Sequence, residues 1–384
     1  MIKFTPTSNS YMSTRAGTVK SDIGFIPTPQ RSLTLSEFKE AEKLSEMGVD
    51  IKFPHQIFEI NKFFKDNTIR SLKPESEVFD KQKTYIEKFS DAYVGKLSLF
   101  HPIVKSGTII SDEANEALIE LQIQADIDMI TVLEPHHNST LNEFKNRLDR
   151  SIEIVEESKG GTGVRSVLPI LRMDSEDERF KNKIDLVSDL DSVAGINLVY
   201  SSIKSNFPNY LELMKFSEEN NKLIYMSEID RTWRSNKKTS IMHFLQLFGI
   251  DMFGVKSGIP LPFGIINVKK KTPQRFDGGS LGLITPKEHK NMYGNAIGCT
   301  SKCPICKDKA TIEKFYDVYY NADILSPSIK IHESFESLAQ FLIGRQNILD
   351  NTFRKNYIVK RKFLADAVRG ILNQDPTQGN LFGQ

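Results

Sequence analysis

All three cysteines of the 384-residue chain fall within eight positions. Cys299, Cys303 and Cys306 belong to the stretch CTSKCPIC, and His332 stands 26 residues after the last of them. Thiolates are the soft ligands that Zn²⁺ prefers, and one imidazole completes a tetrahedral Cys₃His set. Because four protein ligands leave no open coordination position, the pattern predicts a structural zinc site. The alternative is three unligated thiols in a loop, although free thiols so close together invite oxidation.

Two clusters of basic residues indicate contact with a polyanion. The first cluster is Lys269, Lys270, Lys271 and Arg275, and the second is Arg354, Lys355, Lys360, Arg361 and Lys362 with Phe353, Tyr357 and Phe363 among them. Cations neutralise phosphates, and interleaved aromatic rings can stack on a displaced base. A solvated helix face is the alternative for any single charge run. Since the two clusters flank the cysteine stretch, we expect nucleic-acid binding there.

The elements that must position these residues follow an alternating pattern of strands and helices. The candidate strands are residues 22–27, 49–54, 96–102, 127–135, 165–173, 194–202, 222–228 and 250–257, and the candidate helices include residues 35–48, 111–125, 139–159 and 209–220. Eight strands, each followed by a helix, close most naturally into a (β/α)₈ TIM barrel. An open, doubly wound α/β sheet is the alternative.

The composition changes after the eighth candidate strand and predicts the domain organisation. Residues 1–257 are expected to form the barrel, and residues 258–375 a zinc subdomain with C-terminal basic helices. Residues 376–384 resemble a loose tail. Hydrophobic residues make up 39% of the chain and charged residues 26%, which is ordinary for a globular protein in solution.

The absence of targeting segments and the small net charge indicate the compartment of the protein and the way it could bind a nucleic acid. No apolar run approaches the ~20 residues that span a bilayer, and the N-terminal stretch lacks the apolar core of a secretory signal. These absences, with cysteines that read as reduced metal ligands, predict a cytoplasmic protein with no membrane partner. The net charge is only +2, so a nucleic acid must be held by local patches.

The active site of a barrel is built at the carboxyl ends of its strands. The chemically capable residues at those predicted ends are His55, His101, Glu134, His136, His137, Arg172, Asp174, Tyr200, Glu228, Asp230, Arg231 and Lys256. Glu228 and Asp230 finish the seventh strand and are the best candidates for a nucleophile or a general base. A helix-capping role is the alternative for Asp230.

A barrel followed by clustered cysteines and a remote histidine resembles the guanine transglycosylase superfamily, which includes the queuine and archaeosine tRNA–guanine transglycosylases. The stretch GIDMF at residues 249–253 is similar to the family's eighth strand, and residues 111–135 resemble its fourth strand and preceding helix. The family's zinc pattern is Cys-x-Cys-x₂-Cys-x₂₅-His. Cys303, Cys306 and His332 match its last three ligands, whereas the first interval here is longer.

The resemblance implies a pentosyltransferase that exchanges bases. In the family an aspartate attacks C1′ of a guanosine, guanine leaves, and a 7-deazaguanine takes its place. That nucleophile follows the phenylalanine of strand eight, where this chain has Gly254. A second key aspartate, after strand three, is replaced by Lys105. Asp251, three residues before Gly254, is a further catalytic candidate, although it lies near the start of its strand.

The resemblance also suggests residues that bind the base. Glu134 stands one position from the family's base-recognising aspartate and could accept hydrogen bonds from N1 and N2 of guanine. Its alternative role is an ion pair with a neighbouring cation such as Arg172. Arg172 ends strand five, where the family has an amide, and could donate to O6 of the base or to a phosphate.

These departures make the chain more similar to the divergent DNA branch of the family, found in phages and genomic islands, than to the tRNA enzymes. The expected reaction is exchange of guanine in DNA for a 7-deazaguanine such as preQ0, which protects DNA from restriction nucleases; if phage-encoded, the protein works in the host cytoplasm. A tRNA enzyme is the first alternative. The others are a non-catalytic nucleic-acid-binding paralogue or subunit, as a homodimer or with a heteromeric partner, and an unrelated zinc-stabilised barrel hydrolase.

Overall fold

The structure is a computed structural model. It describes residues 2–9, 15–35, 38, 57–105, 107–136, 138–158, 165–203, 205–229, 245–256, 275–277, 282–284 and 291. The predicted boundary at residue 257, the zinc ligands and the tail therefore fall outside the described residues. In the region of the predicted zinc subdomain the structure describes one antiparallel pair, β13 (Arg275–Asp277) with β14 (Gly282–Ile284).

The central sheet consists of parallel strands that close on themselves. Its strands are β4 (Gln30–Arg31), β5 (Leu33–Thr34), β6 (Ile57–Phe64), β7 (Leu97–Val104), β8 (Met129–Val132), β9 (Ser166–Arg172), β10 (Gly195–Val199), β11 (Leu223–Ile229) and β12 (Met252–Val255). Only Ser32 separates β4 from β5. This short segment therefore acts as one strand that pairs with β12 on one side and with β6 on the other. The result is an eight-stranded, barrel-like sheet.

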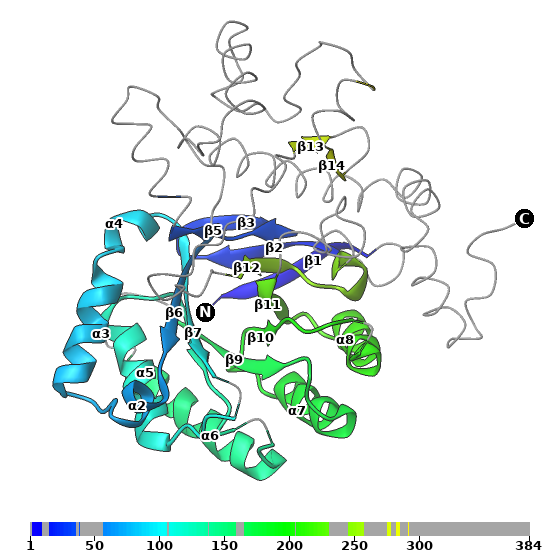
Figure 1. Ribbon diagram of the computed structural model, residues 1–384. Coiled ribbons are helices and arrows are strands. Elements are labelled where there is room, and N and C mark those ends of the chain that lie inside the picture. Colours follow the sequence, from blue (N-terminus) through cyan, green and yellow to red (C-terminus); the bar gives the residue numbers. More distant parts are fainter. Residues whose placement is uncertain are drawn as a thin grey trace, which may run out of the picture.

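Helices cover the outside of the sheet (Figure 1). They are α2 (Asp66–Arg70), α3 (Glu77–Glu87), α4 (Ser90–Tyr93), α5 (Asp112–Gln124), α6 (Leu141–Glu157), α7 (Asp177–Asp189) and α8 (Phe207–Glu219). Local sequence explains where some begin: Ser111 caps α5, and Thr140 forms a capping box with Glu143 at the start of α6. None of the helices described here is long and apolar enough to cross a membrane.

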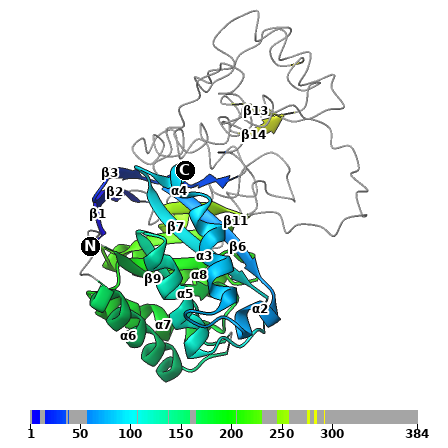
Figure 2. The same ribbon diagram turned by 90° about the vertical axis from the view of Figure 1, so that its left-hand side faces the viewer.

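A three-stranded antiparallel sheet closes the amino-terminal end of the barrel (Figure 2). It is formed by β1 (Lys3–Asn9), β2 (Arg15–Ser21) and β3 (Gly24–Thr28). Its buried side chains, among them Phe4 and Val19, pack in one cluster with Ile57, Leu97 and Met252 from the starts of barrel strands. The opposite end, where the strands finish, is left for a functional site.

The predicted α/β fold is confirmed as a barrel-like parallel sheet flanked by helices. The last six predicted strands overlap β7 to β12, and the helices predicted at 111–125, 139–159 and 209–220 correspond to α5, α6 and α8. The first predicted barrel strand, 22–27, is wrong, because those residues lie in the antiparallel sheet. The prediction at 49–54 lies outside the described residues.

The sequence pattern missed two barrel strands, the segment 30–34 and β6, because both contain polar side chains. Residues 30–34 read QRSLT and β6 reads IFEINKFF, so neither is the apolar run that marks a buried parallel strand. Both carry polar side chains into the barrel, where Ser32 and Glu59 are buried and hydrogen-bonded to each other. Buried polar side chains thus interrupted the hydrophobic pattern of these two strands.

Candidate active site

Polar side chains form a layer inside the barrel. Side chains alternate along a strand, so Glu59 and His101 lie on the same inner face as Ile57 and Leu99, which belong to the inner apolar cluster. We define the polar layer as Ser32, Glu59, His101 and Asn197, each no more than 1% exposed. Barrel interiors are usually filled by branched apolar residues. Burying polar groups in this way is costly, which makes the polar layer a candidate for a functional role.

Glu228 lies at the end of β11 and connects the polar layer to the surface. Its Oε1 is 3.2 Å from His101 Nε2, and Asn197 Nδ2 is 3.3 Å from His101 Nδ1. Nε2 donates to the Glu228 carboxylate, and the Asn197 amide lies against the other ring nitrogen. His101 is thus held between an amide and a carboxylate.

The backbone at Glu228 is strained. The φ angle of Glu228 is 58°, in the left-handed region that residues other than glycine rarely adopt. The pairing of β11 with β12 also shifts register here, between Met226 and Ile229. Strain of this kind collects at functional sites, where the surrounding structure holds a side chain in one direction. Here the direction is toward His101.

Charges around Glu228 favour its ionised form. Burial by itself raises the pKa of this carboxyl group, but the hydrogen bond and charge of His101 oppose that effect, as do the charges of Lys256 and Arg172. The net result is a pKa below the ordinary value of 4.5. Glu228 is therefore a carboxylate at neutral pH, which is the state required of a nucleophile or a base.

Glu59 is the opposite case, a carboxyl whose protonated form is favoured. Burial raises its pKa above 4.5, and the charge of Glu228 adds to this, while His101 and the hydrogen bond from Ser32 oppose it. Ser32 Oγ donates to Glu59 Oε2 at 2.9 Å. A side chain at position 254 would place its Cβ only 2.3 Å and 2.6 Å from the two Glu59 oxygens. The glycine of β12 therefore makes room for the carboxyl of β6.

Glu59→Gln is expected to raise the free energy of unfolding by about 1–3 kcal/mol at neutral pH. A carboxyl with a raised folded-state pKa binds more protons when folded, so it makes stability fall as pH rises above 4.5. Glutamine removes that loss, and the difference between variant and wild type should therefore grow with pH from there. Thermal unfolding between pH 4 and 8 measures it. A variant less stable than wild type at pH 7 would mean that Glu59 is ionised and stabilising.

A cleft opens above the polar layer at the carboxyl ends of β7 to β11. The cleft is open to solvent, and about 510 Å³ of empty space lies in and above it. Its lining residues are His101, Pro102, Val104, Lys105, Gly107, Thr108, Ile110, Leu133, Glu134, His136, Ile170, Arg172, Val199 and Glu228. The structure thus brings together five of the residues expected at strand ends, namely His101, Glu134, His136, Arg172 and Glu228.

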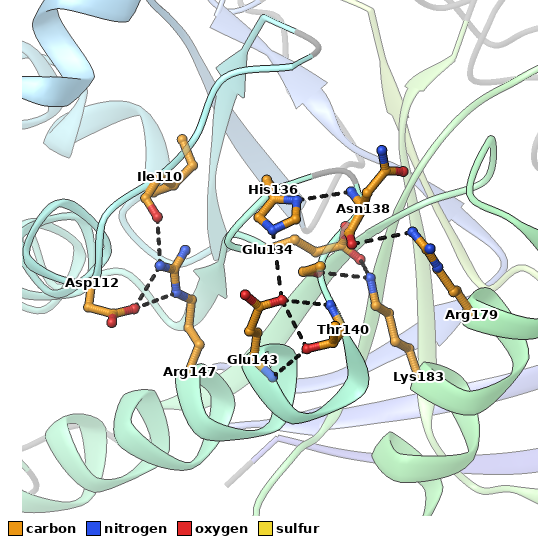
Figure 3. Close-up of polar contacts among 11 residues, drawn as sticks. Ile110, Asp112, Glu134, His136, Asn138, Thr140, Glu143, Arg147, Arg179 and Lys183 are labelled. Atoms are coloured by element: carbon orange, nitrogen blue, oxygen red, sulfur yellow. Dashed lines mark hydrogen bonds and ion pairs between the residues drawn. The ribbon is translucent and has the colours of Figure 1, made fainter.

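Glu134 lines the cleft and has one carboxylate oxygen with no partner among the described residues. Lys183 Nζ of α7 donates to Glu134 Oε1 at 3.0 Å and to Ser139 Oγ at 3.1 Å (Figure 3). Glu134 Oε2 is buried and has no hydrogen-bond partner among the described residues. Burial raises the pKa of Glu134, and the charges of Lys183 and Arg172 oppose this. An acceptor left in this state is suited to a ligand that brings N–H donors.

The predicted ion pair of Glu134 therefore exists, but with a different cation. Arg172 binds Asp174 instead, with Nε to Oδ1 at 3.0 Å and Nη2 to Oδ2 at 3.1 Å. The arginine side chain is 27% exposed and lines the cleft. Its charge reaches Glu134 and Glu228 as a long-range effect on their pKa values.

Asp251 lies at the other end of the barrel, directly before β12. Arg15 binds it through two hydrogen bonds, Nε to Oδ1 at 2.9 Å and Nη2 to Oδ2 at 2.6 Å, and Ile224 N donates to Oδ2 at 2.8 Å. Both side chains are almost wholly buried, at 2% and 0% exposure. Asp251 ties the N-terminal sheet to the barrel and does not line the cleft. We therefore leave it out of the proposed catalytic set.

Several residues predicted for catalysis, zinc binding and nucleic-acid binding lie outside the described part of the chain. These are the general-base candidate Asp230, the zinc ligands Cys299, Cys303, Cys306 and His332, and the basic residues Lys269, Lys270, Lys271, Arg354, Lys355 and Arg361. Arg275 is described only as a backbone position in β13. Among the described residues, no group of three or more histidine, cysteine or carboxylate side chains could hold a metal ion.

Sequence reasoning missed four residues of the site, namely Ser32, Glu59, Asn197 and Lys183. Glu59 was hidden because β6 was not recognised as a strand. Asn197 does lie in a predicted strand, GINLV, where a lone amide within an apolar run was a usable signal. Lys183 comes from α7, and only the tertiary packing of that helix brings it to Glu134.

Comparison with known proteins adds no identification. No family model matches the chain, and no curated protein is significantly similar to it. The functional argument therefore depends on the cleft and on the chemistry of its residues.

Proposed function

We propose that this protein is a DNA–guanine transglycosylase, a pentosyltransferase that replaces guanine in DNA with a 7-deazaguanine such as preQ0. The observation that supports this most directly is the cleft itself, in which an ionised carboxylate, Glu228, and an unpartnered acceptor, Glu134 Oε2, are found together. Glu228 can attack the sugar at C1′, and Glu134 can recognise the base.

Glu134 is proposed to select the base. Guanine and 7-deazaguanines both carry N1–H and N2–H donors on the same edge, and a buried carboxylate oxygen accepts both well. Lys183 holds the other oxygen and so fixes the direction of the carboxylate. Arg172, in the same cleft, is placed to donate to O6 or to a phosphate. Adenine presents no donor at N1 and would leave Glu134 unpartnered.

Glu228 is proposed to carry out the exchange in two steps. Its carboxylate attacks C1′ while the C1′–N9 bond breaks, and the bonding electron pair leaves with guanine, which takes up one proton. The incoming base then attacks C1′ through its corresponding nitrogen, gives up one proton, and releases Glu228 as a carboxylate. Bonds and protons balance over the two steps. The hydrogen bond from His101 orients Glu228 in both.

Glu134→Gln is expected to lower kcat/KM for guanine exchange by about 10- to 100-fold, which corresponds to leaving one or two buried donors unpaired. The amide has one acceptor fewer and turns a donor toward donors on the base. Initial rates with labelled guanine measure the effect. Glu178→Gln, on the exposed first turn of α7, is the control for a lost charge. Equal rates for the Glu134 variant and wild type would remove Glu134 from base recognition.

The function is tested by supplying labelled guanine or preQ0 with duplex DNA, single-stranded DNA or tRNA and counting base incorporated into polymer. Incorporation into DNA alone supports the proposal. Incorporation into tRNA supports the second candidate, a tRNA–guanine transglycosylase. Binding of nucleic acid without incorporation, by folded and zinc-loaded protein, supports a non-catalytic subunit instead.

Structural zinc and the two basic clusters remain part of the proposal as predictions. Cys299, Cys303, Cys306 and His332 would hold Zn²⁺, and the donor set suits that ion. When bound, the ion would stabilise the fold of its own region. No step of the proposed exchange uses it.

A further inference from the structure

The loop that follows β7 forms one side of the cleft mouth. We call the described residues of this segment, Lys105 and residues 107–110, the rim loop. Lys105, Gly107, Thr108 and Ile110 of this loop line the cleft. Because the loop lines the same cleft as Glu134 and Glu228, it is a place to look for substrate contacts beyond the base itself.

Hydrogen bonds fasten the rim loop to three other elements. Thr108 Oγ1 donates to Asp66 Oδ1 at the start of α2, at 2.8 Å. Ile110 N donates to Pro135 O at 2.8 Å, and Arg147 Nη2 of α6 donates to Ile110 O at 2.6 Å (Figure 3). Because residues on both sides of Ile109 are fixed, the position of Ile109 follows from the fold.

Ile109 is nevertheless exposed. Its side chain is 68% accessible to solvent, while its neighbours Thr108 and Ile110 are 8% and 3% exposed. A lone surface isoleucine needs no explanation by itself. An isoleucine held outward by a fastened loop at the mouth of a cleft is more specific, and the exposed Lys105 begins the same loop.

We propose that Ile109 is a wedge that enters the base stack of duplex DNA and fills the space left by the extruded guanine. The inference rests on the proposed function, since a guanine buried in a duplex must be flipped out before Glu228 can reach C1′. Apolar side chains inserted between base steps are a general means of opening a duplex. Lys105 binds a backbone phosphate beside the opened step.

The experiment compares exchange of labelled guanine into genomic DNA that is either native or heat-denatured. Ile109→Ala is expected to lower the ratio of guanine incorporated into native DNA to guanine incorporated into denatured DNA by about 10-fold or more. The reason is that alanine no longer fills the gap in the base stack, so the free-energy cost of unstacking the guanine is not offset. Incorporation into denatured DNA should stay within about 2-fold of wild type. Ile109→Leu, which keeps the apolar volume, should restore the ratio. Val94→Ala is the matched control, since Val94 is 71% exposed and lies before β7, at the far end of that strand.

Each other outcome has a distinct meaning. Ile109→Ala could lower guanine incorporation into native and denatured DNA equally, or change neither. In either case the proposed wedge is wrong, while the transglycosylase function stands. If wild type acts only on denatured DNA, the protein opens no duplex and the wedge is wrong. If wild type incorporates guanine into neither DNA, the proposed function fails and the wedge fails with it.

Discussion

Glu228→Gln is expected to abolish base exchange, with a loss of about 10³-fold or more in kcat, because the amide cannot form the glycosyl ester. Glutamine keeps the shape of the side chain and can still accept the hydrogen bond that His101 donates at 3.2 Å. The fold should therefore be unchanged. Rates of labelled-guanine incorporation, with circular dichroism as the check on folding, measure the effect.

A second readout distinguishes a nucleophile from a residue that only binds. Wild type mixed with DNA and quenched in denaturant should retain some covalent protein–DNA adduct, and Glu228→Gln should retain none. Glu219→Gln, an exposed residue in the last turn of α8, controls for the loss of a charge. An adduct in the Glu228 variant would move the nucleophile elsewhere, and the undescribed Asp230 would be the next residue to replace.

The pH dependence follows from the same carboxyl. His101, Lys256 and Arg172 together lower the pKa of Glu228 below 4.5 despite its burial. The nucleophile is therefore ionised at every pH above that value, and loss of its ionised form cannot limit exchange between pH 5 and 8. A fall in rate within that range would have to come from another group.

Asp251→Asn is expected to destabilise the protein by about 3–5 kcal/mol while the folded fraction keeps its exchange activity. The variant leaves the Arg15 guanidinium buried at 2% exposure without its anionic partner. It also removes a carboxylate that accepts from Ile224 N. Denaturant unfolding and the exchange rate per folded molecule, measured at low temperature, separate stability from catalysis.

The paired variant Arg15→Leu with Asp251→Leu provides the control for this ion pair. Removing both charges leaves no buried ion unpaired, so the double variant should be more stable than either single variant. A folded Asp251→Asn protein with normal stability but no exchange would reverse our assignment and return Asp251 to the catalytic set.

Much of the fold could be predicted because most barrel strands are apolar runs that are recognisable in the sequence. The apolar runs at β7 to β12 and the capped, amphipathic α5 and α6 satisfy local rules that act within a few residues. The first two barrel strands could not be found in this way. Ser32 and Glu59 interrupt their apolar patterns, and the stability of those strands comes from pairing with distant partners, such as Met252 with Gln30.

The candidate site also contains residues that could be predicted from the sequence and residues that could not. Glu134, Arg172 and Glu228 were predictable because the carboxyl ends of parallel strands gather at one end of a barrel, whatever the details of packing. Their partners were not. Nothing in the order of residues links Glu134 to Lys183, which is 49 positions away, or Asp251 to Arg15, which is 236 positions away.

The sequence by itself therefore determined the class of fold, the end of the barrel where chemistry is possible, and the predicted metal ligands, because these depend on residue type and short-range spacing. Only the tertiary structure decided which carboxyl has a lowered pKa, which has a raised pKa, and which forms a buried ion pair with an arginine. The protonation state of a carboxyl depends on burial and on charges within a few ångströms. For Glu228, Glu59 and Asp251, those charges come from residues that the fold, and not the sequence order, brings near.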